Sequence, residues 1–282
     1  MSQKPIIKFD GPKFNREGST NPNDFFRMSF YRYAVLVLAI LFFGMDLNAQ
    51  DDSEAEIDPS KPTNFYTQLI NQLEYNSRKS GGNIMGYRGE IQLAPSESHL
   101  LLAELPLLYN DESGNFGLGD ARVRYFYLPY KNYDKFIGAF GPSIDIFMPT
   151  GSYENGLGSS SWLIQPGVTV GLMIADWIQM FPILSYQYTS KPSTDMIPEE
   201  MKMDQHGISF QIITPIIFSE NFFVQVTPAY TASDFGNDRK DRYIQELFGQ
   251  YKINSKLQAS FFYRGVFQDE DHTVRLGLVV FL

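Results

Sequence analysis

Residues 162–174 read WLIQPGVTVGLMI and alternate between two kinds of side chain. One set of alternate positions is apolar and includes Trp162, Val168 and Ile174, while the other set is small or polar and includes Thr169. A period of two places successive side chains on opposite faces of a β-strand. A tilted strand needs about 9–11 residues to cross the hydrocarbon core of a bilayer. The stretch therefore predicts a two-faced strand that is long enough to span a membrane.

The same alternation recurs from about residue 68 to residue 282, and no stretch sustains a helical period. Turn residues divide this region into about twelve segments. They cover residues 68–78, 84–94, 99–109, 118–128, 136–148, 162–174, 178–189, 206–218, 222–232, 242–252, 257–267 and 273–282. We predict an all-β fold, namely a transmembrane antiparallel up-and-down β-barrel of about twelve strands.

The connections between these segments differ in length in a regular way. The even-numbered connections are mostly short and cover 95–98, 129–135, 175–177, 219–221 and 253–256. The odd-numbered connections are mostly long and polar, at 110–117, 149–161, 190–205 and 233–241. Outer-membrane barrels have short periplasmic turns and longer outside loops, and an even strand number returns both termini to the periplasm. The sorting therefore favours such a barrel over a soluble sandwich.

The composition excludes several other classes of protein. The chain has 282 residues and no cysteine, so it holds no disulfide scaffold, thiolate metal site or thiol nucleophile. Its 23 basic and 32 acidic residues give a net charge of -9, which argues against nucleic acid as a partner. The mean hydropathy of -0.22 excludes a bundle of membrane helices. It is compatible with a barrel, because only every second strand residue there is apolar.

An apolar run, AVLVLAILFFG, occupies residues 34–44, and Arg27 and Arg32 precede it. Eleven residues are too few for a membrane-spanning helix, which needs about 20. A positive flank, a short apolar run and a small residue at the end are typical of a secretory signal peptide. We predict that signal peptide over residues 28–49, with cleavage after Ala49. The alternatives are a buried core helix and a membrane anchor.

The remaining N-terminal residues carry two further predictions. Because a signal peptide starts near the chain terminus, residues 1–27 are interpreted as a non-native extension, with translation starting at Met28. Residues 50–67 are predicted to form a flexible periplasmic lead-in to the barrel of residues 68–282, because most of this segment is charged and poor in apolar residues. Removal of residues 1–49 leaves 17 basic and 28 acidic residues, a net charge of -11.

If the apolar face of each strand meets lipid, its other face lines the lumen. The charged residues on that face are Glu74, Arg88, Glu90, Glu104, Asp120, Arg122, Arg124, Asp145, Glu246, Arg264 and Arg275. Six acids and five bases suggest a paired network. Eight strands leave room only for side chains and sixteen leave an aqueous channel, so twelve predict a narrow pore or ligand tunnel. Arg122 and Arg124 are our candidates for its constriction; the alternative is that these charges only fill and rigidify the barrel.

The outer loops are predicted to be acidic. Twelve acids fall in them, at Asp111, Glu112, Glu154, Asp195, Glu199, Glu200, Asp204, Asp234, Asp238, Asp269, Glu270 and Asp271. Only four bases accompany them, Lys191, Lys202, Arg239 and Lys240. Such a rim can bind the divalent cations that bridge lipopolysaccharide, disfavour anionic solutes, or simply be a solvated surface.

The sequence contains no pattern of residues that indicates catalysis. A strand rather than a helix follows Gly117, so this glycine-rich stretch is no phosphate loop. The three histidines lie in separate turns, which argues against a metal site. His206 and Ser209 are three residues apart, so in a strand they point to opposite faces and form no dyad. We therefore predict no catalytic residue, no metal and no cofactor, and conclude that the chain is not an enzyme.

A short motif resembles a known family. Residues 116–120 read FGLGD, and together with the strand at 121–128 they resemble the Gly-Leu-Gly-Asp signature of the outer-membrane family named after the meta-pathway of phenol degradation. Downstream, MPTG at 148–151, GLGSSS at 156–161 and LIQPG at 163–167 are similar to the next block of that family. The resemblance is best over residues 116–175.

The resemblance implies an outer-membrane barrel that passes small, often hydrophobic or aromatic molecules and performs no enzymatic step. It also implies that Asp120 faces the lumen beside Arg122 and Arg124, where it can pair with them.

The other motif residues have structural roles in this interpretation. Gly117 and Gly119 would permit a bulge or the close approach of an outer loop. Pro149 and Gly151 would end a strand and turn the chain.

We therefore predict a passive channel for small solutes in the outer membrane of a Gram-negative bacterium. The alternative function is a non-transporting structural or adhesive barrel whose acidic loops are the working surface. The expected partners are outer-membrane lipid and lipopolysaccharide, a small-molecule solute, and the periplasmic chaperones and barrel-assembly machinery that such proteins need. Nucleic acid is not an expected partner.

Overall fold

The computed structural model describes residues 63–235 and 240–282. The predicted extension, the predicted signal peptide and most of the predicted lead-in lie outside these residues. The described residues form β1 (Gln68–Ser77), β2 (Ile84–Ser96), β3 (His99–Asn110), β4 (Asn115–Leu118), β5 (Ala121–Tyr127), β6 (Tyr130–Lys131), β7 (Ile137–Met148), β8 (Leu163–Ala175), β9 (Ile178–Thr189), the short 3-10 helix η1 (Glu199–Met201), β10 (Gln205–Ser219), β11 (Phe222–Ser233), β12 (Lys240–Lys252), β13 (Leu257–Val266) and β14 (Asp271–Phe281).

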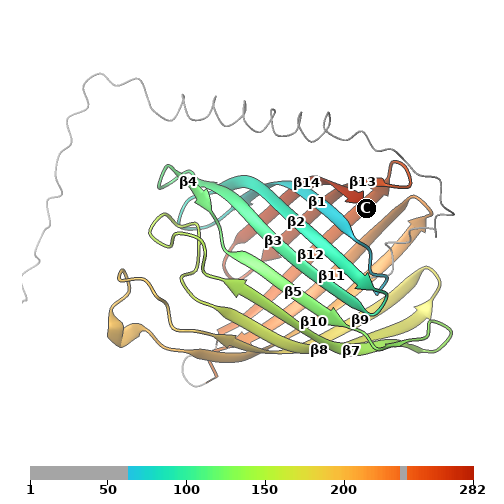
Figure 1. The fold of residues 1–282 in the computed structure, drawn as a ribbon. Helices are drawn as coiled ribbons and strands as arrows, with labels where there is room; N and C mark the ends of the chain where they lie inside the picture. The colour runs from blue at the N-terminus through green and yellow to red at the C-terminus, as the bar shows by residue number, and fades with distance from the viewer. Residues whose placement is uncertain (1–62, 236–239) are drawn as a thin grey trace, which may run out of the picture. The chain divides into compact units, whose positions relative to one another are not determined.

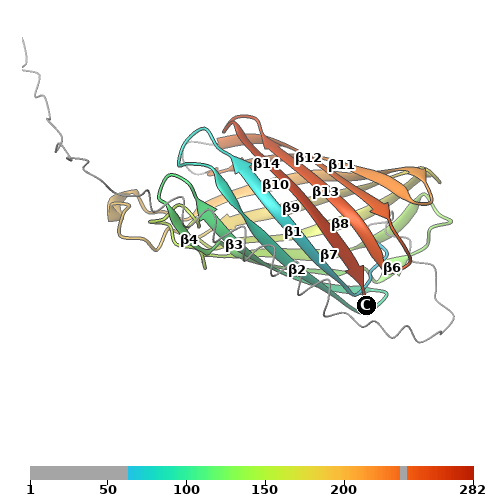
Figure 2. The same cartoon turned by 90° about the horizontal axis from the view of Figure 1, so that it is seen from above.

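Twelve of these strands form a closed ring. Each long strand pairs antiparallel with its two neighbours, in the order β1, β2, β3, β5, β7 and then β8 to β14. The pairing of β1 with β14 closes the ring, with Gln68 opposite Phe281 and Glu74 opposite Arg275. Figure 1 shows the tilted strands, and Figure 2 shows β1 beside β14. The predicted twelve-stranded antiparallel barrel is confirmed.

The fourth predicted segment, 118–128, differs from the others because it is broken. Leu118 of β4 pairs with Leu107 of β3, and Arg122 of β5 pairs with Glu104 of β3. Four residue steps on one strand thus oppose three on the other, which is a one-residue β-bulge at Gly119 and Asp120. The bulge interrupts the inward and outward alternation at this point.

The two faces of the wall differ as the alternation predicts. Large apolar side chains are exposed all round the outer face, for example Leu105, Leu184 and Leu276. In a closed barrel every strand pairs on both sides, so its backbone can enter hydrocarbon without unsatisfied polar groups. The fold is that of a transmembrane β-barrel. Among the described residues, no helix is long and apolar enough to cross a bilayer.

The long and short connections lie at opposite ends of the barrel. Residues 149–162 and 190–204 project at the left in Figure 1, and the C-terminus lies at the right with the short turns. We call these the long-loop end and the short-turn end.

The last residues of the predicted lead-in are packed against the barrel at the short-turn end. Thr63 is buried and accepts a hydrogen bond at its carbonyl oxygen from Lys131 Nζ at 2.6 Å. The Phe65 ring lies 6.2 Å from that of Phe126, and Tyr66 meets Phe281 edge to face at 5.7 Å. Both partners point inward, so this part of the lead-in enters the barrel interior.

Candidate functional site

A belt of paired charges lines part of the inner wall, and Glu74 on β1 is its centre. Its carboxylate accepts hydrogen bonds from Arg275 Nε of β14 at 2.6 Å and from Arg88 of β2 at 2.7 and 3.0 Å. The Glu74 side chain is 4% exposed. The inward alternation of three adjacent strands places these groups together, and two arginines share one buried carboxylate.

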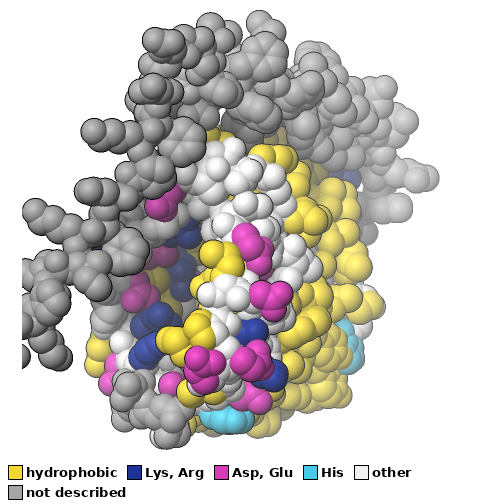
Figure 3. Space-filling model, turned by 90° about the vertical axis from the view of Figure 1, so that its left-hand side faces the viewer, with side chains coloured by type: hydrophobic (Ala, Val, Ile, Leu, Met, Phe, Trp, Pro, Cys, Tyr) yellow, Lys and Arg dark blue, Asp and Glu magenta, His cyan; other side chains and the backbone are white. Residues whose placement is uncertain are grey.

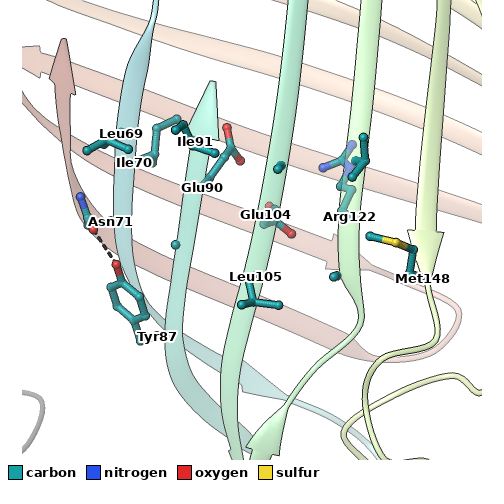
Figure 4. Close-up of a pocket in the computed structure, with 14 residues that line it drawn as sticks. Leu69, Ile70, Asn71, Tyr87, Glu90, Ile91, Glu104, Leu105, Arg122 and Met148 are labelled. Carbon is teal, nitrogen blue, oxygen red and sulfur yellow. Dashed lines mark hydrogen bonds between the residues drawn. The ribbon is translucent and has the colours of Figure 1, made fainter. Parts of the chain in front are cut away.

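The belt continues across β2 and β3. Arg88 Nη1 also donates to Glu104 Oε1 at 2.5 Å, so this arginine bridges two acids. Glu90 lies beside Glu104 in the strand register and accepts a hydrogen bond from Gln92 Nε2 at 2.5 Å. Figure 4 shows Glu90, Glu104 and Arg122 on three neighbouring strands. The acids of this sector are therefore surrounded by arginine and amide donors.

Arg122 and Arg124, the predicted constriction residues, share Asp145. Arg122 donates from Nε at 2.8 Å and from Nη2 at 2.6 Å to the two oxygens of Asp145. Arg124 Nε donates at 2.9 Å, and its Nη2 also contacts that carboxylate. The two guanidinium groups lie over inward phenylalanine rings, Arg122 over Phe147 at 4.9 Å and Arg124 over Phe126 at 5.6 Å. Such bidentate and stacked contacts fix an arginine in place.

Water reaches the belt most freely at Glu246 of β12 and Arg264 of β13. These residues oppose each other in the register, and Arg264 Nε lies 3.3 Å from Glu246 Oε1. Their side chains are 32% and 34% exposed. This pair is thus the part of the belt that a solute in the lumen would meet most directly.

Asp120 departs from its expected position. Its carboxylate accepts hydrogen bonds from the backbone N–H groups of Gly151 at 3.0 Å and Ser159 at 2.7 Å, rather than from the two arginines. The bulge explains this difference, because the extra residue turns Asp120 away from the face that Arg122 occupies. Without Asp120, the belt holds five acids and five arginines and is electrically balanced.

The other motif residues surround the same loop. A Cβ atom on Gly119 would lie 2.7 Å from Leu108 Cδ1, and one on Gly151 would lie 2.5 Å from Leu157 O. Pro149 is the first residue after β7. These residues therefore permit a close approach of loop 149–161 to the strands below it.

The inner wall of β8 to β11 carries no charged side chain at all. Its inward polar groups are amides and hydroxyls: Gln165, Thr169, Gln179, Ser185, Gln187, Gln205, Ser209, Gln211, Gln225, Thr227 and Thr231. Ser209 pairs in register with Ser185 on one side and Thr231 on the other. In the ring of twelve, β9 is six strands from β1 and β10 is six from β2. This uncharged wall therefore faces the charged belt across the lumen.

A hollow of about 420 Å³ opens in the wall of β1, β2, β3, β5 and β7. Gly89, which has no side chain, and Ala103, which has a short one, are among its lining residues. Asn71 and Tyr87 lie at its edge, and the Tyr87 hydroxyl donates to Asn71 Oδ1 at 2.5 Å (Figure 4). Polar side chains on a wall that faces hydrocarbon need such partners.

Charged side chains also gather at the long-loop end, which Figure 3 views directly. Lys202 and Lys191 lie 2.9 and 3.4 Å from the two oxygens of Glu199, and their hydrogen bonds hold the pKa of this carboxyl below its usual range. Arg242 similarly contacts Asp269 at 2.7 Å. The pairs Lys191–Glu199 and Arg242–Asp269 are exposed on both sides, and exposed pairs contribute little to stability.

Neither a metal cluster nor a catalytic dyad emerges from the geometry. Within residues 63–235 and 240–282, no three His, Cys, Asp or Glu side chains are placed to hold a metal ion. His206 is exposed on the outer face and lies near Tyr186 and Tyr188, whereas Ser209 belongs to the inward set. The two side chains therefore do not meet.

Sequence reasoning overlooked two features of the site. The uncharged wall is visible in the sequence, because the strand segments between residues 162 and 233 lack Asp, Glu, Lys and Arg. Leu157 is buried against inward residues of β2 and β3. Its only sequence signal is a single apolar residue between glycines in an otherwise polar loop.

Comparison of the sequence with protein-family models and with curated proteins gives no match. Solved structures do match the fold. An outer-membrane channel from Pseudomonas putida F1 has 12% identity and a TM-score of 0.59, over 83% of this chain and 100% of that one. The NanC porin has 11% identity and a TM-score of 0.57, over 75% and 99%. The KdgM porin in complex with disordered oligogalacturonate has 12% identity and a TM-score of 0.50, over 75% and 98%. At these identities the likeness is one of fold, the fold of outer-membrane channels and porins.

Proposed function

We propose that the protein is a passive channel for small solutes in the outer membrane of a Gram-negative bacterium. The observation that carries the proposal is a closed barrel with an apolar outer wall and a polar, partly water-accessible inner wall. The fold similarity to outer-membrane channels and porins supports it. Outer-membrane lipid surrounds the wall, and the acidic loops meet lipopolysaccharide. Chaperones and the barrel-assembly machinery deliver the protein.

The belt at Arg122, Arg124 and Asp145 forms the constriction in this proposal. Because its five acids and five arginines balance, it discriminates weakly between small cations and anions. Solutes pass between this belt and the uncharged wall opposite. No step requires a catalytic residue, a metal or a cofactor.

A finer proposal concerns the solute. The resemblance to the phenol-degradation family implies small hydrophobic or aromatic molecules. The inner wall supports this class with four phenylalanines that are only partly buried, which are Phe126, Phe147, Phe248 and Phe262. Aromatic rings pack favourably on one another in offset or edge-to-face arrangements.

Recordings from planar bilayers test the channel. Refolded mature protein is expected to give discrete conductance steps. The double variant Arg122→Gln/Arg124→Gln removes two positive charges from the belt, so the reversal potential in a salt gradient should shift towards cation selectivity. Lys191→Gln/Lys202→Gln makes the same charge change in an outer loop and serves as the control. Equal conductance and selectivity in all three proteins would refute the constriction.

The alternative is a non-transporting structural or adhesive barrel, and the packing at the short-turn end favours it. Ile70, Val279 and Phe281 form a buried cluster there, and Tyr66 packs against it. A barrel that stays silent in the bilayer, and also fails to swell liposomes in solutions of small aromatic solutes, would support this alternative.

A further inference from the structure

Loop 149–161 folds into the long-loop end of the barrel instead of extending away from it. Leu157 at its tip is 5% exposed and packs with Ile84 of β2 and Leu108 of β3. Both partners belong to the inward sets of their strands, which also contain Arg88 and Glu104. The loop starts at the end of β7, so it passes β5 and β3 at the mouth, above the charged belt, to reach β2.

Asp120 holds this loop at both of its ends. One carboxylate oxygen accepts a hydrogen bond from Gly151 N–H at 3.0 Å, and the other accepts one from Ser159 N–H at 2.7 Å. Hydrogen bonds to an ionised acceptor are stronger than those between neutral groups. The fit is close, because a Cβ atom on Gly158 would lie 2.6 Å from Asp120 Oδ1. Thr150 adds a contact by donating from its hydroxyl to Gly119 O at 2.8 Å.

The middle of the loop is tied to β3 and to the strand that follows it. Asn110 Nδ2 donates to Asn155 O at 3.0 Å, and Asn115 Nδ2 donates to Asn155 Oδ1 at 2.8 Å. In addition, a Cβ atom on Gly117 would lie 3.2 Å from Leu157 Cδ1. The loop is thus anchored at its ends, its middle and its apolar tip.

A second loop is fastened onto the first. Ser193 N–H donates to Ser160 O at 2.9 Å, and Thr194 Oγ1 donates to Glu154 Oε1 at 2.9 Å. Hydrogen bonds from its own backbone N–H, from Thr194 and from Ser152 hold the pKa of the Glu154 carboxyl below its usual range. Loop 190–204 is therefore attached to loop 149–161.

We propose that loop 149–161 is a second, fixed constriction inside the outer mouth, above the charged belt, and that Asp120 is the residue that positions it. This role accounts for the FGLGD, MPTG and GLGSSS motifs together, because they supply the carboxylate, the two N–H donors and the close approach that the clamp needs. The effect on transport rests on the proposed channel function. The position of the loop does not rest on that function, and a separate experiment tests it.

Thiol labelling tests the position of the loop without any transport. The chain has no cysteine, so Leu157→Cys introduces a single thiol. This thiol should react with a water-soluble maleimide much more slowly than one introduced by Met196→Cys on the exposed neighbouring loop. Adding Asp120→Asn should speed labelling at position 157 by about tenfold, since it weakens charge-assisted hydrogen bonds. Equal labelling at positions 157 and 196 in the protein that retains Asp120 would overturn the proposal.

Asp111→Asn is the matched control for charge. Its carboxylate lies in a neighbouring loop and accepts hydrogen bonds from Asn83 N at 2.6 Å and Asn83 Nδ2 at 2.9 Å, away from the clamp. It should leave labelling of the thiol at position 157 unchanged. Gly158→Ala perturbs the clamp without any change of charge and should act as Asp120→Asn does. Heat-modifiable gel mobility checks that each variant is a folded barrel.

Single-channel recording then separates the two proposals. Asp120→Asn and Gly158→Ala should raise the conductance, whereas Asp111→Asn should not. Slow labelling at position 157 in a silent barrel would retain the loop assignment and refute the channel. Fast labelling in a conducting barrel would retain the channel and refute the loop assignment. Unchanged conductance despite fast labelling in the Asp120→Asn protein would show that loop 149–161 does not act as a constriction.

Discussion

Two sectors of the inner wall, one of eight strands and one of four, differ in the kind of polar side chain that they carry. The sector from β12 through β14 and β1 to β7 holds the ten charged side chains of the belt, most of which pair with one another across neighbouring strands. In the sector from β8 to β11, the inward polar side chains are amides and hydroxyls alone. Removing one partner of an ion pair out of bulk water leaves an uncompensated charge, whereas removing one partner of a neutral pair leaves only an unpaired dipole, which costs less. Substitutions in the charged sector should therefore change stability and ion selectivity more than substitutions in the uncharged sector.

The largest effect is expected for Glu74→Ala. It leaves Arg88 without one partner and Arg275 without its carboxylate, and removing one partner from a buried pair costs about 3–5 kcal/mol. Ser209→Ala on the uncharged wall should change stability by less than about 0.5 kcal/mol. Urea unfolding in lipid vesicles, followed by the fluorescence of the two tryptophans, measures both. Similar losses for the two variants would contradict the division of the wall.

Asp145→Asn should convert the balanced belt into an anion-selective one. The substitution removes one negative charge beside Arg122 and Arg124, so the belt as a whole carries one excess positive charge. In a salt gradient, the reversal potential should shift from near zero in the natural protein towards the equilibrium potential of the anion. Gln165→Asn, which changes the residue opposite Asp145 in the register, is the neutral control. A shift of equal size in the control would show that the charge is not responsible.

Gln211→Glu tests the uncharged wall by giving it a charge. The new carboxylate has no arginine on β9, β10 or β11 to pair with, so it should favour cations. We expect a shift of the reversal potential that is opposite in sign to that of Asp145→Asn and smaller. Gln211→Asn controls for the change in shape. An unaltered reversal potential would mean that solutes do not pass along this wall.

The smallest effect is expected for Glu246→Gln. This acid and Arg264 are about one-third exposed, and water screens pairs of this kind, which are worth less than about 1 kcal/mol. Its unfolding midpoint in urea should stay close to that of the natural protein, and any difference should shrink further at high salt. A loss comparable to that of Glu74→Ala would show that the belt acts as one cooperative unit.

Much of the barrel was predictable because alternation is a local property. Residues 162–174 alternate in the sequence, and the side chains of β8 (Leu163–Ala175) point to the two faces that this pattern predicts. The inward position of Glu104 and Arg122 follows from the same rule. Asp120 did not follow it, because a single extra residue at the bulge reverses the faces locally. A bulge depends on the partner strand, so alternation within one strand does not reveal it.

The sequence by itself determined that the chain folds into twelve two-faced strands with long and short connections at opposite ends. It did so because the period of two and the turn residues act over only a few positions. Only the tertiary structure decided which charges meet. Glu74 and Arg275 are 201 residues apart and join because the first strand closes on the last. The clamp of Asp120 on loop 149–161 likewise needs the pairing of β2, β3, β5 and β7, which places these strands side by side at one mouth.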